Sequence, residues 1–183
     1  IENNGLIQIE SLEYKKLIGV TLENNSEIYV NYSSEIKLSG GCVINNTETG
    51  TIEILSNGGL AQEEPGNTVN NEGSIRKLVD ESGSFGVFYM LFDMNNAGIL
   101  EVDENQQFLF LGSNITLNNM ETGVLKGFGA FDITSNFINL GTIAPGSEDS
   151  TGTLQVTNYL NLSPQAKLEF DIAGILAGEF DVI

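Results

Sequence analysis

Apolar residues alternate with polar residues over short stretches all along the chain. Ile28–Val30, Ile52–Ile54 and Leu100–Val102 each place one polar or aromatic residue between two aliphatic ones. A period of two is typical of strands with one buried face. No long stretch has the 3.6-residue period of a helix, and the best helix candidates are Ile9–Leu17 and a single turn at Ala61–Pro65. We therefore expect an all-β protein.

A short motif recurs along the chain: an Asn-Asn pair, a polar spacer that usually contains glycine, and an apolar β-forming residue. The six pairs are Asn3-Asn4, Asn24-Asn25, Asn45-Asn46, Asn70-Asn71, Asn95-Asn96 and Asn118-Asn119, and a degenerate seventh copy runs from Asn139 to Ile143. The first asparagines of successive pairs are 21, 21, 25, 25 and 23 residues apart. Such regular spacing identifies the chain as a repeat protein.

Each copy of the motif indicates a tight turn, because Asn and Gly tolerate positive φ better than other residues. Repeats of this length, with two or three short strands each, are typical of a parallel β-helix whose coils stack about 4.8 Å apart. We predict a single right-handed parallel β-helix, or β-solenoid, of about seven coils of 20–25 residues. Equivalent asparagines would then stack, and their amides would either form a hydrogen-bonded ladder or only mark a row of turns.

Two longer spacers, Asn57–Thr68 and Glu81–Tyr89, are expected to protrude as loops. Phe85–Phe92 is the most apolar stretch of the chain. We interpret it as a core strand, with an exposed patch for a partner or neighbouring subunit as the alternative. Cys42, the only cysteine, lies in an apolar run and is expected to be a small buried hydrophobe. A catalytic thiol is excluded because the chain has no histidine to act as its base.

The composition narrows the range of partners. The chain has 183 residues, 40% of them apolar, which is enough for one sizeable core. Its 25 acidic and 7 basic residues give a formal net charge of −18. This charge repels phosphate backbones and anionic lipid headgroups, so we expect no nucleic acid or membrane-surface partner. The longest apolar stretch is too short to insert across a bilayer.

The C-terminal quarter carries a different series of motifs. They are Gly141-Thr142-Ile143-Ala144-Pro145-Gly146-Ser147, Thr151–Val156, Leu160–Ser163, Ala166–Gly174 and Glu179–Val182. This order resembles the closing section of autotransporter-type passengers and related large bacterial surface β-helix proteins, and the upstream Asn-Gly repeats resemble the passenger coils of the same proteins. We therefore divide the chain into 1–138, the Asn/Gly-repeat coils, and 139–183, a passenger-like segment continuous with them.

The resemblance implies a secreted stalk or adhesin, located outside the cell or at its surface, and it supplies no catalytic residues. One departure is Glu148-Asp149, which interrupts a run where the family pattern usually keeps small residues. The family's proteins continue into further strands beyond the point that matches Ile183. We therefore expect the natural polypeptide to be longer than this chain.

A polysaccharide-active β-helix enzyme is the first alternative, because it would have the same fold. Glycosidase chemistry needs two or three carboxylates that face one groove. The candidate acids are Glu63-Glu64, Asp80-Glu81, Asp103-Glu104, Asp132 and Asp149, and no motif fixes their geometry. The chain also has no Trp to stack on sugar rings, and Arg76 is its only arginine. We therefore expect no enzyme activity and no catalytic residue.

Metal chemistry is equally restricted. Without histidine, and with one cysteine, the chain cannot build an ordinary zinc or redox site, which leaves oxygen-ligated ions such as calcium. Asp93, Asn95, Asp103 and Glu104 place carboxylates and an amide near corners where calcium could bridge coils. No EF-hand loop is present. We expect no cofactor, with structural calcium at these four residues as the alternative.

Taken together, the sequence predicts a structural or adhesive, non-catalytic segment of a large secreted or cell-surface protein. The expected partner of such a segment is an extracellular glycan or a protein receptor. A second alternative is a self-assembling extracellular filament or surface-layer subunit. Such a subunit would associate through the open strand edges of its end coils.

Overall fold

The computed structural model describes residues 1–10, 13–31, 35–55, 59–80, 83–112, 114–134, 136–148, 150–158, 160–174, 176–178 and 180–183. These residues form twenty-two strands and no helix. Every pair of neighbouring strands is parallel, and the strands form three sheets that we name A, B and C. The described residues therefore include no helix that could cross a membrane.

Each coil contributes one strand to each sheet in turn. Sheet A contains β1 (Glu2–Asn3), β4 (Thr21–Asn24), β7 (Val43–Asn46), β10 (Thr68–Asn71), β13 (Asp93–Asn96), β16 (Thr116–Asn119) and β19 (Asn136–Asn139). Sheet B contains β2 (Leu6–Glu10), β5 (Glu27–Asn31), β8 (Thr51–Leu55), β11 (Ser74–Leu78), β14 (Ile99–Val102), β17 (Val124–Gly127), β20 (Thr142–Pro145) and β22 (Lys167–Leu168). Sheet C contains β3 (Lys15–Ile18), β6 (Glu35–Ser39), β9 (Gly59–Gln62), β12 (Gly86–Met90), β15 (Gln106–Phe110), β18 (Ala130–Ile133) and β21 (Gln155–Asn158).

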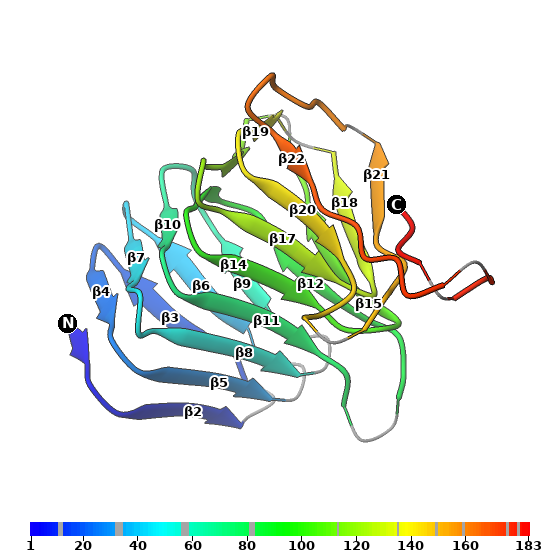
Figure 1. Cartoon of the computed structure of the whole chain (residues 1–183). Helices are drawn as coiled ribbons and strands as arrows, with labels where there is room; N and C mark the ends of the chain where they lie inside the picture. The colour runs from blue at the N-terminus through cyan, green and yellow to red at the C-terminus, as the bar shows by residue number, and fades with distance from the viewer. Residues whose placement is uncertain are drawn as a thin grey trace.

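The three sheets rise together from the N-terminus to the C-terminus. Figure 1 shows the strands of sheet B stacked as steps in front of those of sheet C, with the short strands of sheet A closing the coil at one side. Neighbours within a sheet are one coil apart in sequence, which is the defining topology of a β-solenoid. The predicted class, a parallel β-helix of about seven coils, is confirmed.

The core consists of stacked rows of inward-facing side chains. On sheet B the paired residues form the row Ile28, Ile52, Ile75, Leu100, Leu125 and Ile143, and on sheet A the row Leu22, Ile44, Val69, Met94, Leu117 and Phe137. On sheet C, the ring centroid of Phe108 lies 5.6 Å from that of Phe88 and 5.4 Å from that of Phe131. Each buried aliphatic or aromatic side chain contributes about 1.5–3 kcal/mol, so stacking of like on like stabilises every coil against the next.

The apolar stretch Phe85–Phe92 follows the same alternation of inward and outward side chains. Phe88, Met90 and Phe92 have no exposed surface, whereas Phe85 and Tyr89 are exposed. Its interpretation as a core strand is therefore confirmed for β12, whose outward side chains Val87 and Tyr89 are half-buried and exposed, respectively. Cys42 is also fully buried, as predicted for a small hydrophobe.

The two helix candidates are wrong. Ala61 and Gln62 belong to β9. In Ile9–Leu17, Ile9 and Glu10 end β2 and Lys15 begins β3, while Glu13 and Tyr14 lie between the two strands. The physical reason is that each coil must supply a strand to sheet C, and Ala61 pairs in register with Lys37 one coil earlier. Strands shorten the two predicted loops, since β9 lies within Asn57–Thr68 and β12 begins at Gly86, within Glu81–Tyr89. Residues 56–58 and 81–82 lie outside the described part of the chain.

Candidate functional site

The most extensive polar feature is a column of asparagine side chains inside the solenoid, at the corner where sheet A meets sheet B. We call it the inner ladder, and its members are Asn3, Asn24, Asn46, Asn71, Asn96, Asn119 and Asn139. From Asn3 to Asn119, each Nδ2 donates a hydrogen bond of 2.7–2.8 Å to Oδ1 of the next asparagine toward the C-terminus. All seven side chains are at most 6% exposed. Stacking therefore produces a hydrogen-bonded ladder and not only a row of turns.

The second amide hydrogen fixes the corner of the following coil. Asn46 Nδ2 also donates to the backbone oxygen of Ser74 at 3.1 Å, and Asn71 Nδ2 donates to that of Ile99 at 3.1 Å. An asparagine side chain has one carbonyl and two N–H donors, so it can link both the next side chain and the next backbone. The inner ladder thus satisfies buried polar groups that the corner would otherwise leave unpaired.

The glycines of the motif are required by close contact. A Cβ on Gly50 would lie 2.3 Å from the backbone oxygen of Asn24, and one on Gly98 would lie 2.1 Å from that of Gly73. Neither glycine has positive φ, and none of the paired asparagines does. The expectation that positive φ explains the motif is therefore wrong: the corner needs space for the ladder and the neighbouring backbone.

The asparagine pairs are not equivalent along the chain. Asn3 and Asn24, the first members of their pairs, occupy the inner ladder, whereas the later pairs use their second members. Successive inner-ladder residues are therefore 21, 22, 25, 25, 23 and 20 residues apart. Asn4 and Asn25 follow their ladder residues, and Asn25 Nδ2 donates to Asn4 Oδ1 at 2.9 Å.

A second column lies on the outer face of sheet A. This outer ladder consists of Asn45, Asn70, Asn95 and Asn118, linked by hydrogen bonds of 2.8 Å between their amides. Its side chains are half-buried, and Asn45 Nδ2 donates to Glu23 Oε1 at 2.7 Å below it. Both columns follow from parallel in-register strands, which place identical residues one above another.

The inner ladder ends at the eighth coil. Leu162 lies opposite Asn139 in a parallel bridge, so no side-chain oxygen meets Asn139 Nδ2. This nitrogen is buried and has no hydrogen-bond partner among the described residues. At the other end, Asn3 Oδ1 accepts a hydrogen bond from the backbone nitrogen of Gly5 at 3.2 Å.

Charged side chains alternate in sign along one outward row of sheet B. Arg76 Nη1 lies 3.2 Å from Glu53 Oε1 and its Nε lies 3.1 Å from Glu101 Oε2, while Lys126 Nζ lies 3.8 Å from the same oxygen of Glu101. The next residue in the row is Ala144, which pairs with Lys126. Because alanine has no charged group, the series of ion pairs ends at Lys126.

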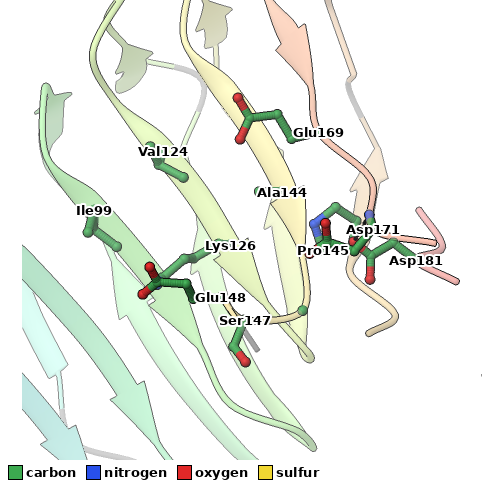
Figure 2. Close-up of a pocket in the computed structure, with 11 residues that line it drawn as sticks. Ile99, Val124, Lys126, Ala144, Pro145, Ser147, Glu148, Glu169, Asp171 and Asp181 are labelled. Carbon is green, nitrogen blue, oxygen red and sulfur yellow. Dashed lines mark hydrogen bonds between the residues drawn. The ribbon is translucent and has the colours of Figure 1, made fainter. Parts of the chain in front are cut away.

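A hollow of about 300 Å³ lies beside Ala144 and is rich in acids; we call it the acidic hollow (Figure 2). Its lining includes Lys126, Glu148, Glu169, Asp171 and Asp181. Asp181 is only 8% exposed, and its two oxygens accept hydrogen bonds from the backbone nitrogens of Gly152 and Asp171 at 2.6 and 2.8 Å. This carboxylate therefore holds the C-terminal segment against the preceding coil.

The sequence-derived acids that the structure describes do not all line one groove. Asp132 accepts a hydrogen bond from Gln107 Nε2 at 3.1 Å and another from Asn158 Nδ2, on the outer face of sheet C. Glu63 pairs with Lys16. Glu81 and Asp149 lie outside the described residues.

The calcium candidates lie on different elements. Asp93 and Asn95 are in β13, whereas Asp103 and Glu104 are in the turn between β14 and β15. Asp93 Oδ1 accepts the backbone N–H of Thr116 at 2.9 Å, and Asp103 Oδ2 accepts that of Val79 at 3.0 Å. Within the described ranges, no group of three or more acidic or cysteine side chains is arranged to hold a metal ion.

A buried lysine is the main feature that the sequence reasoning missed. Lys77 has no exposed surface, and its Nζ donates to Gln106 Oε1 at 2.7 Å and to the backbone oxygen of Leu78 at 3.2 Å. Burial lowers the pKa of the Lys77 ammonium to about 8, and the charges of Asp80 and Asp103 oppose this shift. The signal was present, since Lys77 stands two residues after Ile75 and therefore on the same inward face.

Comparisons of this chain with protein-family models, with curated proteins and with solved structures found no match.

Proposed function

We propose that this chain is a structural and adhesive, non-catalytic segment of a large secreted or cell-surface protein. The observation that carries the proposal is the inner ladder, in which six side-chain hydrogen bonds join seven coils along the solenoid axis. Solenoids of this kind gain stability from each interface between neighbouring coils, so they can form long rigid spacers.

Three further features support the proposal. The C-terminal motifs resemble those of autotransporter-type passengers and related bacterial surface proteins. The charge of −18 favours solubility of an extended surface. Asp181, one of the carboxylates that line the acidic hollow, accepts backbone N–H groups with both oxygens, which favours a structural role for it over a catalytic one.

The test combines location and turnover. Antibodies raised against this chain should label intact cells that make the natural protein, and protease treatment of those cells should remove the label. The purified chain should release no reducing sugar from a panel of plant, fungal and bacterial polysaccharides. Labelling only after cell lysis, or sustained release of sugar that disappears in Glu169→Gln or Asp171→Asn, would refute the proposal.

Self-assembly into a filament or surface layer is the second candidate, and the first coil favours it. β1, β2 and β3 each form the edge of a sheet, and the nearby Ile1, Leu6 and Ile18 are strongly exposed. Unpaired strand edges with exposed apolar residues are a template for pairing with another chain. Sedimentation velocity over a wide concentration range tests this candidate. Growth of large species that Leu6→Lys and Ile18→Lys abolish would support it, and a constant monomer would rule it out.

A further inference from the structure

A row of outward residues follows the corner between sheets B and C over four successive coils. Gly86 pairs with Gln106, so the residues just before them, Phe85 and Asn105, are neighbours. Ala130 pairs with Gln155, so Phe128 and Thr153, two positions earlier, are neighbours in the same way. Because Gln107 pairs with Ala130, the row continues from Asn105 to Phe128. The order along the axis is therefore Phe85, Asn105, Phe128, Thr153.

These four residues line one groove of about 270 Å³, which we call the corner groove. Its other lining residues are Glu104, Gln106, Gly129, Ala130 and Gln155. The Phe85 side chain is 61% exposed, and Phe128 is half-buried. The backbone positions of Phe85 and Phe128 are two coils apart, which corresponds to about 9.6 Å at the usual strand spacing. The corner groove thus offers two apolar surfaces with a polar residue between them.

The polar side chains of the corner groove differ from those of the outer ladder and of the outward row that contains Gln107. Amides in two other outward rows are engaged: the outer-ladder asparagines bind one another, and Gln107 binds Asp132. In the described structure, by contrast, the side chains of Glu104, Asn105, Thr153 and Gln155 make no hydrogen bond or ion pair with the protein. All four are exposed. Their donors and acceptors are available to a ligand.

We propose that the corner groove binds a linear, uncharged glycan that runs along the solenoid axis, with two of its sugar rings on Phe85 and Phe128. Aromatic rings offer the flat apolar faces that the C–H surfaces of pyranose rings contact. The spacing of the two rings suits alternate sugars of an extended chain, and Asn105, Thr153 and Gln155 present amides and a hydroxyl to the sugar hydroxyls between them. Glu104 is the only charged lining residue, and no cation is present to neutralise an acidic sugar. The inference deepens the adhesive role proposed above and rests on it.

NMR titration of the uniformly labelled chain tests this inference. The probes are cellohexaose, chitohexaose and mannohexaose as uncharged ligands, and an oligogalacturonate of equal length as the acidic one. At least one uncharged probe should shift the backbone amide signals of Asn105, Gly129 and Gln155, and the acidic probe should shift none. Phe85→Ala should weaken that binding about tenfold, the effect of losing roughly 1.4 kcal/mol of contact.

Controls separate binding from folding. Phe85 is exposed, so Phe85→Ala should keep the wild-type melting temperature, and Gln155→Ala provides a second surface variant that should also weaken binding. Tyr89→Ala removes an exposed aromatic on the neighbouring strand β12, outside the lining of the groove, and should bind like wild type. The inference is overturned if no uncharged probe binds, if Phe85→Ala binds like wild type, or if only oligogalacturonate binds. Such an outcome would leave a stable surface solenoid intact, whereas an intracellular location would refute the proposed function itself.

Discussion

Asn71 donates a 2.7 Å hydrogen bond through Nδ2 to Oδ1 of Asn96, 25 residues further along the chain, and both side chains are almost completely buried. Asn71 also accepts from Asn46 at the same distance. One side chain thus joins three consecutive coils. Its neighbour Asn70 makes the same type of contact on the outer face, where solvent competes for the amide.

Loss of one inner-ladder side chain should destabilise the solenoid strongly. Asn71→Ala leaves the buried Oδ1 of Asn96 without its donor, removes an acceptor from Asn46, and frees the backbone oxygen of Ile99. Each unpaired buried polar group costs about 1–3 kcal/mol, so we expect a loss of about 2–4 kcal/mol. Denaturant titration measures this loss. The matched control, Asn70→Ala, should lose less than about 1 kcal/mol because its partners remain partly hydrated. Equal losses would contradict the distinction between the ladders.

The glycine corners should not accept a methyl group. In Gly98→Ala the new Cβ would lie 2.1 Å from the backbone oxygen of Gly73. The two neighbouring coils could relieve this contact only by moving their paired strands. We expect a loss of about 3 kcal/mol or more, the upper range for overpacking. Gly5→Ala is the control, since nothing lies within 4 Å of its Cβ position. Thermal melts compare the two, and a Gly98→Ala variant as stable as Gly5→Ala would show that the corner geometry is wrong.

The open end of the inner ladder offers a stabilising change. Leu162→Asn places a carbonyl oxygen opposite the unpartnered Nδ2 of Asn139. Leu162 is 40% exposed, so little apolar burial is lost, and the new hydrogen bond should stabilise the chain by about 1 kcal/mol. Leu160→Asn, at another exposed leucine, should give no gain. If both variants melt at or below the wild-type temperature, a side chain at position 162 does not pair with Asn139 Nδ2, and the ladder cannot be extended in this way.

The buried lysine should make stability depend on pH in the alkaline range. Its pKa is lowered in the folded protein, from 10.5 to about 8, so the unfolded chain binds more protons between these values. The Lys77 contribution to the free energy of unfolding therefore rises as the pH increases from 8 to 10.5, by about 2–3 kcal/mol. Urea titrations of wild type and Lys77→Met over this range isolate the contribution. Wild type should gain stability relative to Lys77→Met as pH rises, whereas Lys126→Met, on the outer face, should follow wild type. A constant difference between wild type and Lys77→Met would contradict a buried ammonium.

Calcium should have little effect on stability. Asp93 and Asp103, two of the four candidate ligands, each accept a backbone N–H, and a bound ion would have to compete for those oxygens. We expect the melting temperature to change by less than its measurement error between EDTA and millimolar calcium. A calcium-dependent increase that Asp93→Asn or Asp103→Asn removes would instead establish the structural ion that the sequence left open.

The alternation of residues and the Asn-Asn spacing were sufficient to predict the solenoid and the number of its coils. They could not decide which asparagine of a pair faces inward, because a one-residue shift of register moves a side chain to the opposite face. Asn3 and Asn24 differ from the later pairs in this respect, and only their pairing with Asn46 reveals it. The acidic hollow and the corner groove were also beyond the sequence, since they join residues from separate coils and from the C-terminal segment.

The most direct test of the central claim is a single-molecule pulling experiment on the chain held at its two ends. If the inner ladder is what makes the solenoid a mechanical element, the wild-type chain should resist unfolding until a high force is reached. Asn71→Ala should then unfold at a clearly lower force, and Asn70→Ala at the wild-type force. Unfolding of wild type and Asn71→Ala at the same force would contradict the claim that the buried asparagines hold the coils together.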